Sequence, residues 1–305
     1  MNKDMWFGIL IALVPLFIGY SIKLKNAVWI VRVNKSLSYL VYAILFLMGN
    51  ELAQLNDLLN NLQTILSSTI ILFICSFGFN MIFLLILDRI YPWRNQANHH
   101  ELPARWKMIL ESLTIFFALI IGFVCGLLPL AIWQYNQIIS EVILVILLIL
   151  VGIQLRSNNI TVKQIVINQV GITTTLIVIL STLLGGWLAA YLLKLPVNTS
   201  MAMSAGFGWY SLSGILMTEA QGAVVGSITF LSDILRELCA IMLIPSLIRR
   251  YKLTALGICG ATSMDFTLPM LQKGGGIMMV PPAIVQGFLL TLIMPILMTL
   301  LNYYF

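Results

Sequence analysis

The chain has 305 residues, of which 60% are hydrophobic and 9% are charged, and its mean hydropathy is +0.99. This balance excludes a soluble globular protein. The net charge of +6 is spread over short connections and not gathered in a basic stripe, so nothing indicates nucleic-acid binding. Apolar runs of about 20 residues, enough to cross a bilayer, recur from end to end. We therefore predict an all-α polytopic membrane protein that is embedded in the lipid bilayer.

Six apolar segments predict transmembrane helices in the first two thirds of the chain. In order they cover residues 5–22, 36–49 with an earlier start, 62–87, 108–132, 138–155 and 165–193. The connections after the first, third and fifth segments are basic, including the long polar loop over residues 88–107. Basic loops mark the cytoplasmic side of a membrane, so we expect the N-terminus to lie outside.

The next segment, residues 201–216, decides the architecture because it is apolar on average but dense in Gly and Ser. If it crossed the membrane, the helix over residues 227–248 would deliver Arg249, Arg250 and Lys252 to the outside, against the basic-loop rule. If it is a re-entrant loop that enters and leaves from the outside, this basic cluster lies in the cytoplasm. The parity of the crossings therefore favours a re-entrant loop.

A second Gly-rich segment, residues 257–269, is then a re-entrant loop from the inside, and a last helix over residues 277–304 leads outward. The prediction is about eight transmembrane helices and two re-entrant Gly-rich loops, with both termini outside. Broken helices that span the membrane remain the alternative for the two Gly-rich segments.

An internal repeat supports a single transporter domain over residues 1–305. A shift of 103 residues superposes Gly19 on Gly122 and the phrase LFLMGNEL on LILVGIQL, which relates residues of about 1–92 to 105–194. Each copy holds an odd number of helices, so the two copies have opposite orientations.

A weaker match at a shift of about 54 pairs Gly206 with Gly260 and relates residues of about 200–250 to 254–305. Each of these units is one Gly-rich loop and one helix. Nested inverted repeats with Gly/Pro-interrupted segments are typical of secondary transporters.

The apolar helix over residues 227–248 carries three ionisable residues, Asp233, Arg236 and Glu237, and Asp265 lies in the second Gly-rich segment. Ionisable groups at membrane depth are costly and usually face the bundle interior or a water-filled cavity. We interpret them as part of a transport site. An ion pair between Asp233 and Arg236, three residues apart, is the alternative, but it leaves the other two carboxylates without a partner.

Irregular backbone at membrane depth is tolerated only where protein buries it or water reaches it, so we expect both Gly-rich segments to line a cavity. The first offers the hydroxyls of Ser211 and Ser213. Its aromatic residues Trp209 and Tyr210 either form a cation–π wall for an ammonium group or anchor the chain at the membrane interface.

The second Gly-rich segment presents three hydroxyls, those of Thr262, Ser263 and Thr267, around Asp265. This set suits a cation, whether an amine, Na⁺ or a proton. The four cysteines lie in apolar segments without the spacing of metal ligands, so we expect no metal site and no cofactor beyond a coupling ion.

Several runs resemble the bacterial lysine exporter family of the LysO type. They are YPWRN (91–95), LVGIQLR (150–156), GFGWYSLSGIL (206–216), RELCAIMLIP (236–245) and GATSMDFTLP (260–269). The resemblance covers essentially the whole chain. It implies export of L-lysine and toxic analogues such as thialysine across the inner membrane, and it matches the family's two intramembrane acidic residues to Glu237 and Asp265.

Three functional hypotheses are therefore weighed. The first is a secondary exporter of a cationic amino acid, driven by H⁺ or Na⁺ entry, in which buried carboxylates exchange a proton for the substrate ammonium. The second is a monovalent cation/proton antiporter, which needs no amino acid. The third, an intramembrane aspartyl hydrolase using Asp233 and Asp265, lacks the usual Gly-x-Gly-Asp setting, so we expect no enzyme. The coupling ion and the oligomeric state, for which a homodimer is one option, stay open.

Overall fold

The computed structural model describes residues 14–24 except 16, 26–54, 58–93, 117–128, 133, 135–157, 168–264 and 266–304. Every regular element in these ranges is a helix. The long helices are α2 (Ala27–Ala53), α3 (Leu58–Ile90), α5 (Asn136–Ser157), α7 (Gln169–Leu193), α10 (Ala223–Leu247) and α13 (Val280–Tyr304).

Short helices fill the two Gly-rich segments and the turns beside them. They are α8 (Val197–Ser204), α9 (Tyr210–Gln221), α11 (Lys252–Ile258), α12 (Leu268–Gly275) and the 3₁₀ helices η2 (Gly260–Met264) and η3 (Ile277–Met279).

Within the described residues, four helical segments are long and apolar enough to cross a membrane: Val28–Asn50, Asn61–Ile90, Gln169–Leu193 and Val280–Asn302. Two shorter apolar helices, Phe117–Gly126 and Ile138–Gln154, accompany them. The helical, polytopic class predicted from the sequence is therefore confirmed.

Several observed helix boundaries differ from the predicted ones by a few residues, and at two of them a local hydrogen bond is present. The helix predicted over 108–132 ends at Gly126, where a turn follows and the Trp133 indole donates a hydrogen bond to the Leu128 carbonyl at 3.0 Å. The helix predicted from residue 165 begins at Gln169, because the Asn168 side chain accepts the Gly171 N–H at 2.8 Å as an N-cap.

Charged residues placed in loops by the sequence prediction lie instead in buried helix ends. Asp88 belongs to the last turns of α3 and is 6% exposed. Lys252 begins α11 and is also 6% exposed, whereas Arg249 and Arg250 before it are exposed. The rest of the predicted polar loop, from residue 94, lies outside the described residues, as do residues 1–13 of the first predicted helix.

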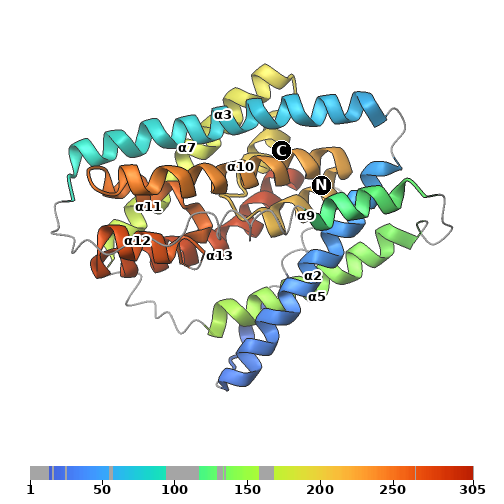
Figure 1. Cartoon of the computed structure of the whole chain (residues 1–305), viewed down its shortest axis with the longest axis horizontal. Coiled ribbons are helices and arrows are strands. Elements are labelled where there is room, and N and C mark those ends of the chain that lie inside the picture. Colours follow the sequence, from blue (N-terminus) through green and yellow to red (C-terminus); the bar gives the residue numbers. More distant parts are fainter. Residues whose placement is uncertain are drawn as a thin grey trace.

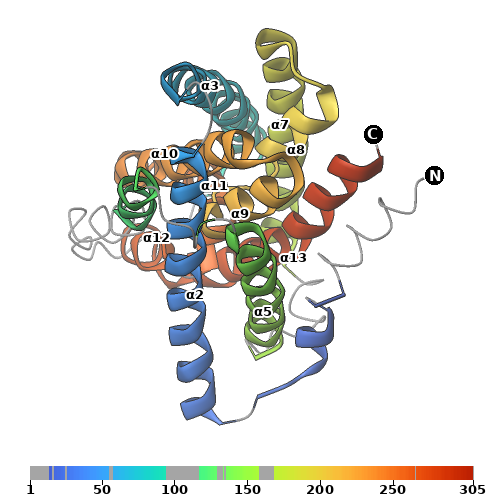
Figure 2. The ribbon, with the colours of Figure 1, turned by 90° about the vertical axis from the view of Figure 1, so that its right-hand side faces the viewer.

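The helices form two groups (Figure 1). α3, α10 and α13 run roughly alongside one another, and α7 crosses α3. α2 and α5 lie side by side and project away from this group, as the second view also shows (Figure 2). The short helices α8, α9 and α11 lie inside, between the long ones, and carry much of the buried core.

Two close helix crossings are related by the same shift of 103 residues that relates the two copies of the first repeat, residues of about 1–92 and 105–194. A methyl group at Gly19 would collide with the carbonyl oxygen of Ile149, and one at Gly122 with that of Phe46. Residues 19 and 46 shifted by 103 are residues 122 and 149. The glycines permit backbone contact at both crossings.

The two units of the second repeat, one from α8 to α10 and the other from α11 to α13, share one order of α-helices. In each, two short helices flank a break, and a glycine separates the second short helix from the long helix that follows. Gly222 ends α9 with φ 90° and ψ 170°, and Gly276 ends α12 with φ 88° and ψ 170°. These two positions are 54 residues apart, and only glycine adopts this backbone conformation readily. Pro245 lies within α10 and Pro295 within α13.

Candidate functional site

Each Gly-rich segment contains a break between two short helices: the first break lies between α8 and α9, and the second between α11 and α12. The two breaks cross and contact each other through their backbones. The N–H of Ala261 donates a hydrogen bond to the carbonyl of Phe207 at 3.0 Å. Phe207 is fully buried and has a positive φ of 51°, which is rare for a residue with a side chain. On either side of the crossing lie Gly208, with φ 84°, and Gly260, with φ 60°. The crossing brings together the two segments that the sequence identified separately.

Asp233 of α10 fixes the first break. One carboxylate oxygen accepts the backbone N–H of Gly208 at 2.8 Å, and the other accepts the hydroxyl of Ser213 at 2.5 Å. The carboxylate also fills the space where a side chain at Gly206 would lie. The structure therefore gives Asp233 and Ser213 a bracing role inside the protein.

The second break is stabilised mainly by its own hydroxyl groups. The backbone N–H and the hydroxyl of Thr267 both bond to the Thr262 carbonyl at 3.0 Å. Ser263 is fully buried and donates to the carbonyl of Ala283 on α13 at 2.9 Å. Gln286, also on α13, donates to the carbonyl of Leu256 at 2.8 Å. These bonds hold the break against α13.

Arg236 and Glu237 are buried on α10 beside the crossing, with 3% and 2% of their surface exposed. The hydrogen bonds to the Asp233 oxygens come from Gly208 and Ser213. The Arg236 side chain instead passes close to Gly208 and Gly260, the glycines that flank the crossing. Asp265 lies outside the described residues.

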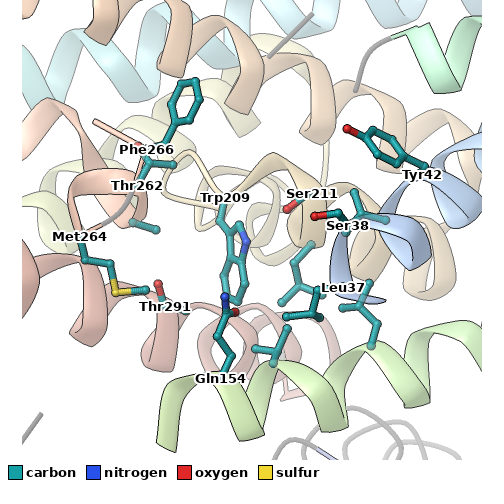
Figure 3. Close-up of a pocket in the computed structure, with 15 residues that line it drawn as sticks. Leu37, Ser38, Tyr42, Gln154, Trp209, Ser211, Thr262, Met264, Phe266 and Thr291 are labelled. Atoms are coloured by element: carbon teal, nitrogen blue, oxygen red, sulfur yellow. The ribbon is translucent and has the colours of Figure 1, made fainter. Parts of the chain in front are cut away.

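A cavity of about 410 Å³ lies next to the crossing, and both groups of helices contribute to it (Figure 3). It is bounded by α2, α5, the first turn of α9, η2 and α13. Its described lining residues are Leu37, Ser38, Val41, Tyr42, Leu147, Val151, Gln154, Trp209, Ser211, Leu212, Ala261, Thr262, Met264, Phe266 and Thr291.

Three of the residues selected from the sequence line this cavity: Trp209, Ser211 and Thr262. The Trp209 indole lies in the middle of the lining side chains, with the Gln154 amide at one end of it (Figure 3). The two Gly-rich segments therefore do meet at one cavity, as expected from the rule that irregular backbone at membrane depth borders a cavity or is buried.

Apart from Asp265, which lies outside the described residues, the other selected residues are absent from the described lining of the cavity. Tyr210 is buried and packs edge to face against Phe230, with ring centroids 6.0 Å apart. The hydroxyls of Ser213, Ser263 and Thr267 make the internal hydrogen bonds described above. The three charged residues of α10 are also absent from the described lining.

Sequence reasoning missed the cavity residues of α2 and α13, namely Ser38, Tyr42 and Thr291. Polar residues in apolar helices could have suggested them, but they do not show which face is turned inward. Gln154 lies in the repeated phrase LILVGIQL, in the last turns of α5. It faces the cavity.

Asp88 is another residue that the sequence did not single out. Its carboxylate accepts the backbone N–H groups of Leu253 at 3.1 Å and Thr254 at 2.7 Å, and the Thr254 hydroxyl at 2.6 Å. It therefore caps the start of α11 from the end of α3. This contact fixes the helix that leads into the second break.

The described lining carries no charged residue, but it combines aromatic rings with hydroxyl and amide groups. An ammonium group binds favourably over an aromatic face such as that of Trp209 or Tyr42. Hydroxyls can orient both the amino and the carboxylate groups of a small molecule. The cavity volume lies within the range of small-molecule sites.

Comparisons with known proteins give a consistent result. A family model described as "Lysine exporter LysO" matches residues 116–302. The chain is 52% identical over 298 residues to the lysine exporter LysO of Escherichia coli K12, covering 96% of this chain and 98% of that protein. It is 41% identical over 181 residues to a putative lysine exporter of Haemophilus influenzae Rd, covering 59% of this chain and 93% of that protein. No solved structure matches.

Proposed function

The chain belongs to the LysO family of lysine exporters, and from that membership we propose that it is a secondary active exporter of L-lysine and of toxic analogues such as thialysine. The family is one of transporters and not of enzymes. The apolar helices place the protein in a membrane. We further propose that this is the bacterial inner membrane and that export is coupled to entry of H⁺ or Na⁺.

The observation that carries the proposal is the cavity at the crossing of the two breaks. It is lined from both helix groups and combines Trp209, Ser211 and Thr262 with the Gln154 amide. In our proposal a lysine ammonium binds over the Trp209 ring and is held by the neighbouring hydroxyls. Interrupted helices that meet at such a cavity are how secondary transporters form substrate sites.

Release of lysine requires that the site changes its exposure from one side of the membrane to the other. The two helix groups line opposite parts of the cavity. A movement of α2 and α5 relative to the crossing would therefore open the cavity to one side of the membrane and then to the other. Glu237 and Asp265 supply the coupling in our proposal: each carboxylate is neutral when it carries a proton and ionised when the lysine ammonium arrives.

Orientation is part of the same proposal. Residues 95–100 and 249–252 lie in the cytoplasm, and residue 197 and the C-terminus lie outside. Single cysteines in a cysteine-free background, labelled from either side of the membrane, test this assignment. Labelling of residue 249 from the outside would contradict it, because the re-entrant assignment depends on that position.

Proteoliposomes test the function directly. Vesicles loaded with labelled lysine receive a pH gradient or a Na⁺ gradient separately, with protein-free vesicles as the control. We expect one gradient to accelerate lysine efflux and excess thialysine to slow it. Efflux equal to that of protein-free vesicles under both gradients would refute the proposal. Cation/proton exchange that lysine neither requires nor inhibits would favour the antiporter alternative.

A further inference from the structure

Arg236 is a buried cation beside the crossing, with 3% of its surface exposed. Within the described part of the chain, its buried Nε and Nη2 atoms donate no hydrogen bond. A buried guanidinium whose N–H groups lack acceptors is costly, because the lost hydration is not replaced. The arrangement therefore calls for an acceptor that binds in the course of function.

The identity of the two free groups indicates the acceptor. Nε–H and Nη2–H lie on the same edge of a guanidinium and point in nearly parallel directions. This edge matches the two oxygens of a carboxylate, which it binds through a pair of charge-assisted hydrogen bonds. A carboxylate is thus the ligand that satisfies both donors at once.

The surroundings of Arg236 also suit an anion that comes from the cavity. The Nε atom lies 3.5 Å from the position a methyl group would take on Gly260, and the Cδ atom 3.5 Å from that on Gly208. Trp209 and Ala261, the next residues in the chain, line the cavity. The first turn of α9 also borders the cavity, and the N-terminal end of this helix is the positive end of its dipole.

We propose that Arg236 is the binding group for the α-carboxylate of the exported amino acid. This inference rests on the proposed function and adds the recognition of the one anionic group of lysine. The carboxylate meets the guanidinium when the crossing of the breaks opens toward the cavity. The side-chain ammonium then points away, toward the aromatic part of the cavity. The competing assignment is that Arg236 only balances the neighbouring carboxylates Asp233 and Glu237.

Wild-type protein, purified in detergent, separates the two assignments through displacement of labelled lysine. The competitors are lysine, lysinamide and cadaverine, which share the side-chain ammonium but differ in the carboxylate. We expect lysinamide and cadaverine to bind roughly 30-fold more weakly than lysine, the lower end of the effect of removing one partner of a buried charged hydrogen bond. Equal displacement by all three would overturn the proposal, whatever the behaviour of any variant.

Substitutions then assign the effect to Arg236 and separate it from the α9 dipole. Arg236→Gln is expected to lower the affinity for lysine to that for cadaverine and to leave the affinity for cadaverine unchanged. Arg236→Lys keeps the charge but loses the paired edge, so it should retain only part of the preference. Arg250→Gln, the same change at an exposed position near the end of α10, is the control and should behave as wild type.

A stable Arg236→Gln protein that still prefers lysine over cadaverine by the wild-type factor would overturn the assignment to Arg236. The proposed function fails separately: it fails if wild-type protein neither binds nor exports lysine. If lysine and cadaverine are bound and exported equally well, the function stands and only the carboxylate site fails.

Discussion

The backbone N–H of Ala261 and the carbonyl of Phe207 are joined by a hydrogen bond of 3.0 Å, which ties the break between α8 and α9 to the break between α11 and α12. The two residues are far apart in the sequence, and each lies beside a glycine with positive φ. The cavity residues Trp209 and Thr262 lie within two residues of this contact, so we expect a change at the crossing to alter the cavity.

Gly260→Ala is expected to abolish transport and to destabilise the protein. The added methyl group would collide with the Phe207 carbonyl oxygen, and the φ of 60° is unfavourable for alanine. We expect a loss of about 3 kcal/mol in the free energy of unfolding, from overpacking and backbone strain together. The measurements are lysine efflux and thermal unfolding in detergent.

The matched control is Gly78→Ala in α3, where a methyl group would meet no atom within 4 Å. It should transport normally and gain up to about 1 kcal/mol from helix propensity. A Gly260→Ala protein as stable and active as this control would show that the crossing is not closely packed.

Asp233 and Ser213 should be energetically coupled because their side chains share a hydrogen bond of 2.5 Å. Asp233→Asn and Ser213→Ala should each lower the unfolding temperature and slow transport. The double variant should lose less than the sum of the two, with a coupling of about 1–2 kcal/mol. Additive losses in the cycle would mean that the two side chains do not contact each other.

Asp88→Ala removes the acceptor of two backbone N–H groups at the start of α11, those of Leu253 and Thr254. Because these groups are buried, we expect a loss of about 2–3 kcal/mol in unfolding free energy. Thr254→Ser keeps the hydroxyl and the bond to Asp88, so it should stay close to wild type. Comparable stability of the Asp88→Ala and Thr254→Ser proteins would rule out the capping role.

Cysteines placed at the two breaks should differ in reactivity. Ser211→Cys faces the cavity, so it should react with a water-soluble thiol reagent, and lysine should slow the reaction. Ser263→Cys should stay inert in this conformation, since Ser263 is fully buried against Ala283. The sequence alone led to the expectation that both Gly-rich segments line a cavity, so it did not distinguish these two positions. Rapid labelling of residue 263 without lysine would place it at a water-filled surface.

The carboxylates Glu237 and Asp265 are expected to be essential for coupling. Glu237→Gln and Asp265→Asn keep the size of the side chain and most of its hydrogen bonds, but neither can take up or release a proton. Both variants should reach the membrane in normal amount and lose resistance to thialysine. Wild-type lysine export by both amide variants, at equal membrane abundance, would show that neither carboxylate is the coupling site.

The sequence determined the helical, membrane-embedded class, most helix positions and the location of the two breaks. Apolar runs have to cover the hydrocarbon, and glycine-rich interruptions within them can persist only where protein or a cavity surrounds them. These constraints act on each segment separately, so they can be read without knowing its neighbours. The same constraint led to the correct expectation that Trp209, Ser211 and Thr262 border a cavity.

Only the tertiary structure decided which side chains of each segment line the cavity and which make contacts inside the protein. Ser211 and Ser213 are two residues apart on α9, so they point in different directions: one lines the cavity and the other binds Asp233. The rotation of α9 that separates them is set by its packing on α10. The bond between Asp88 and Thr254 joins residues 166 positions apart, and no local pattern encodes such a contact. A side chain's role here follows from the helix packed against it, and that is a property of the assembled bundle.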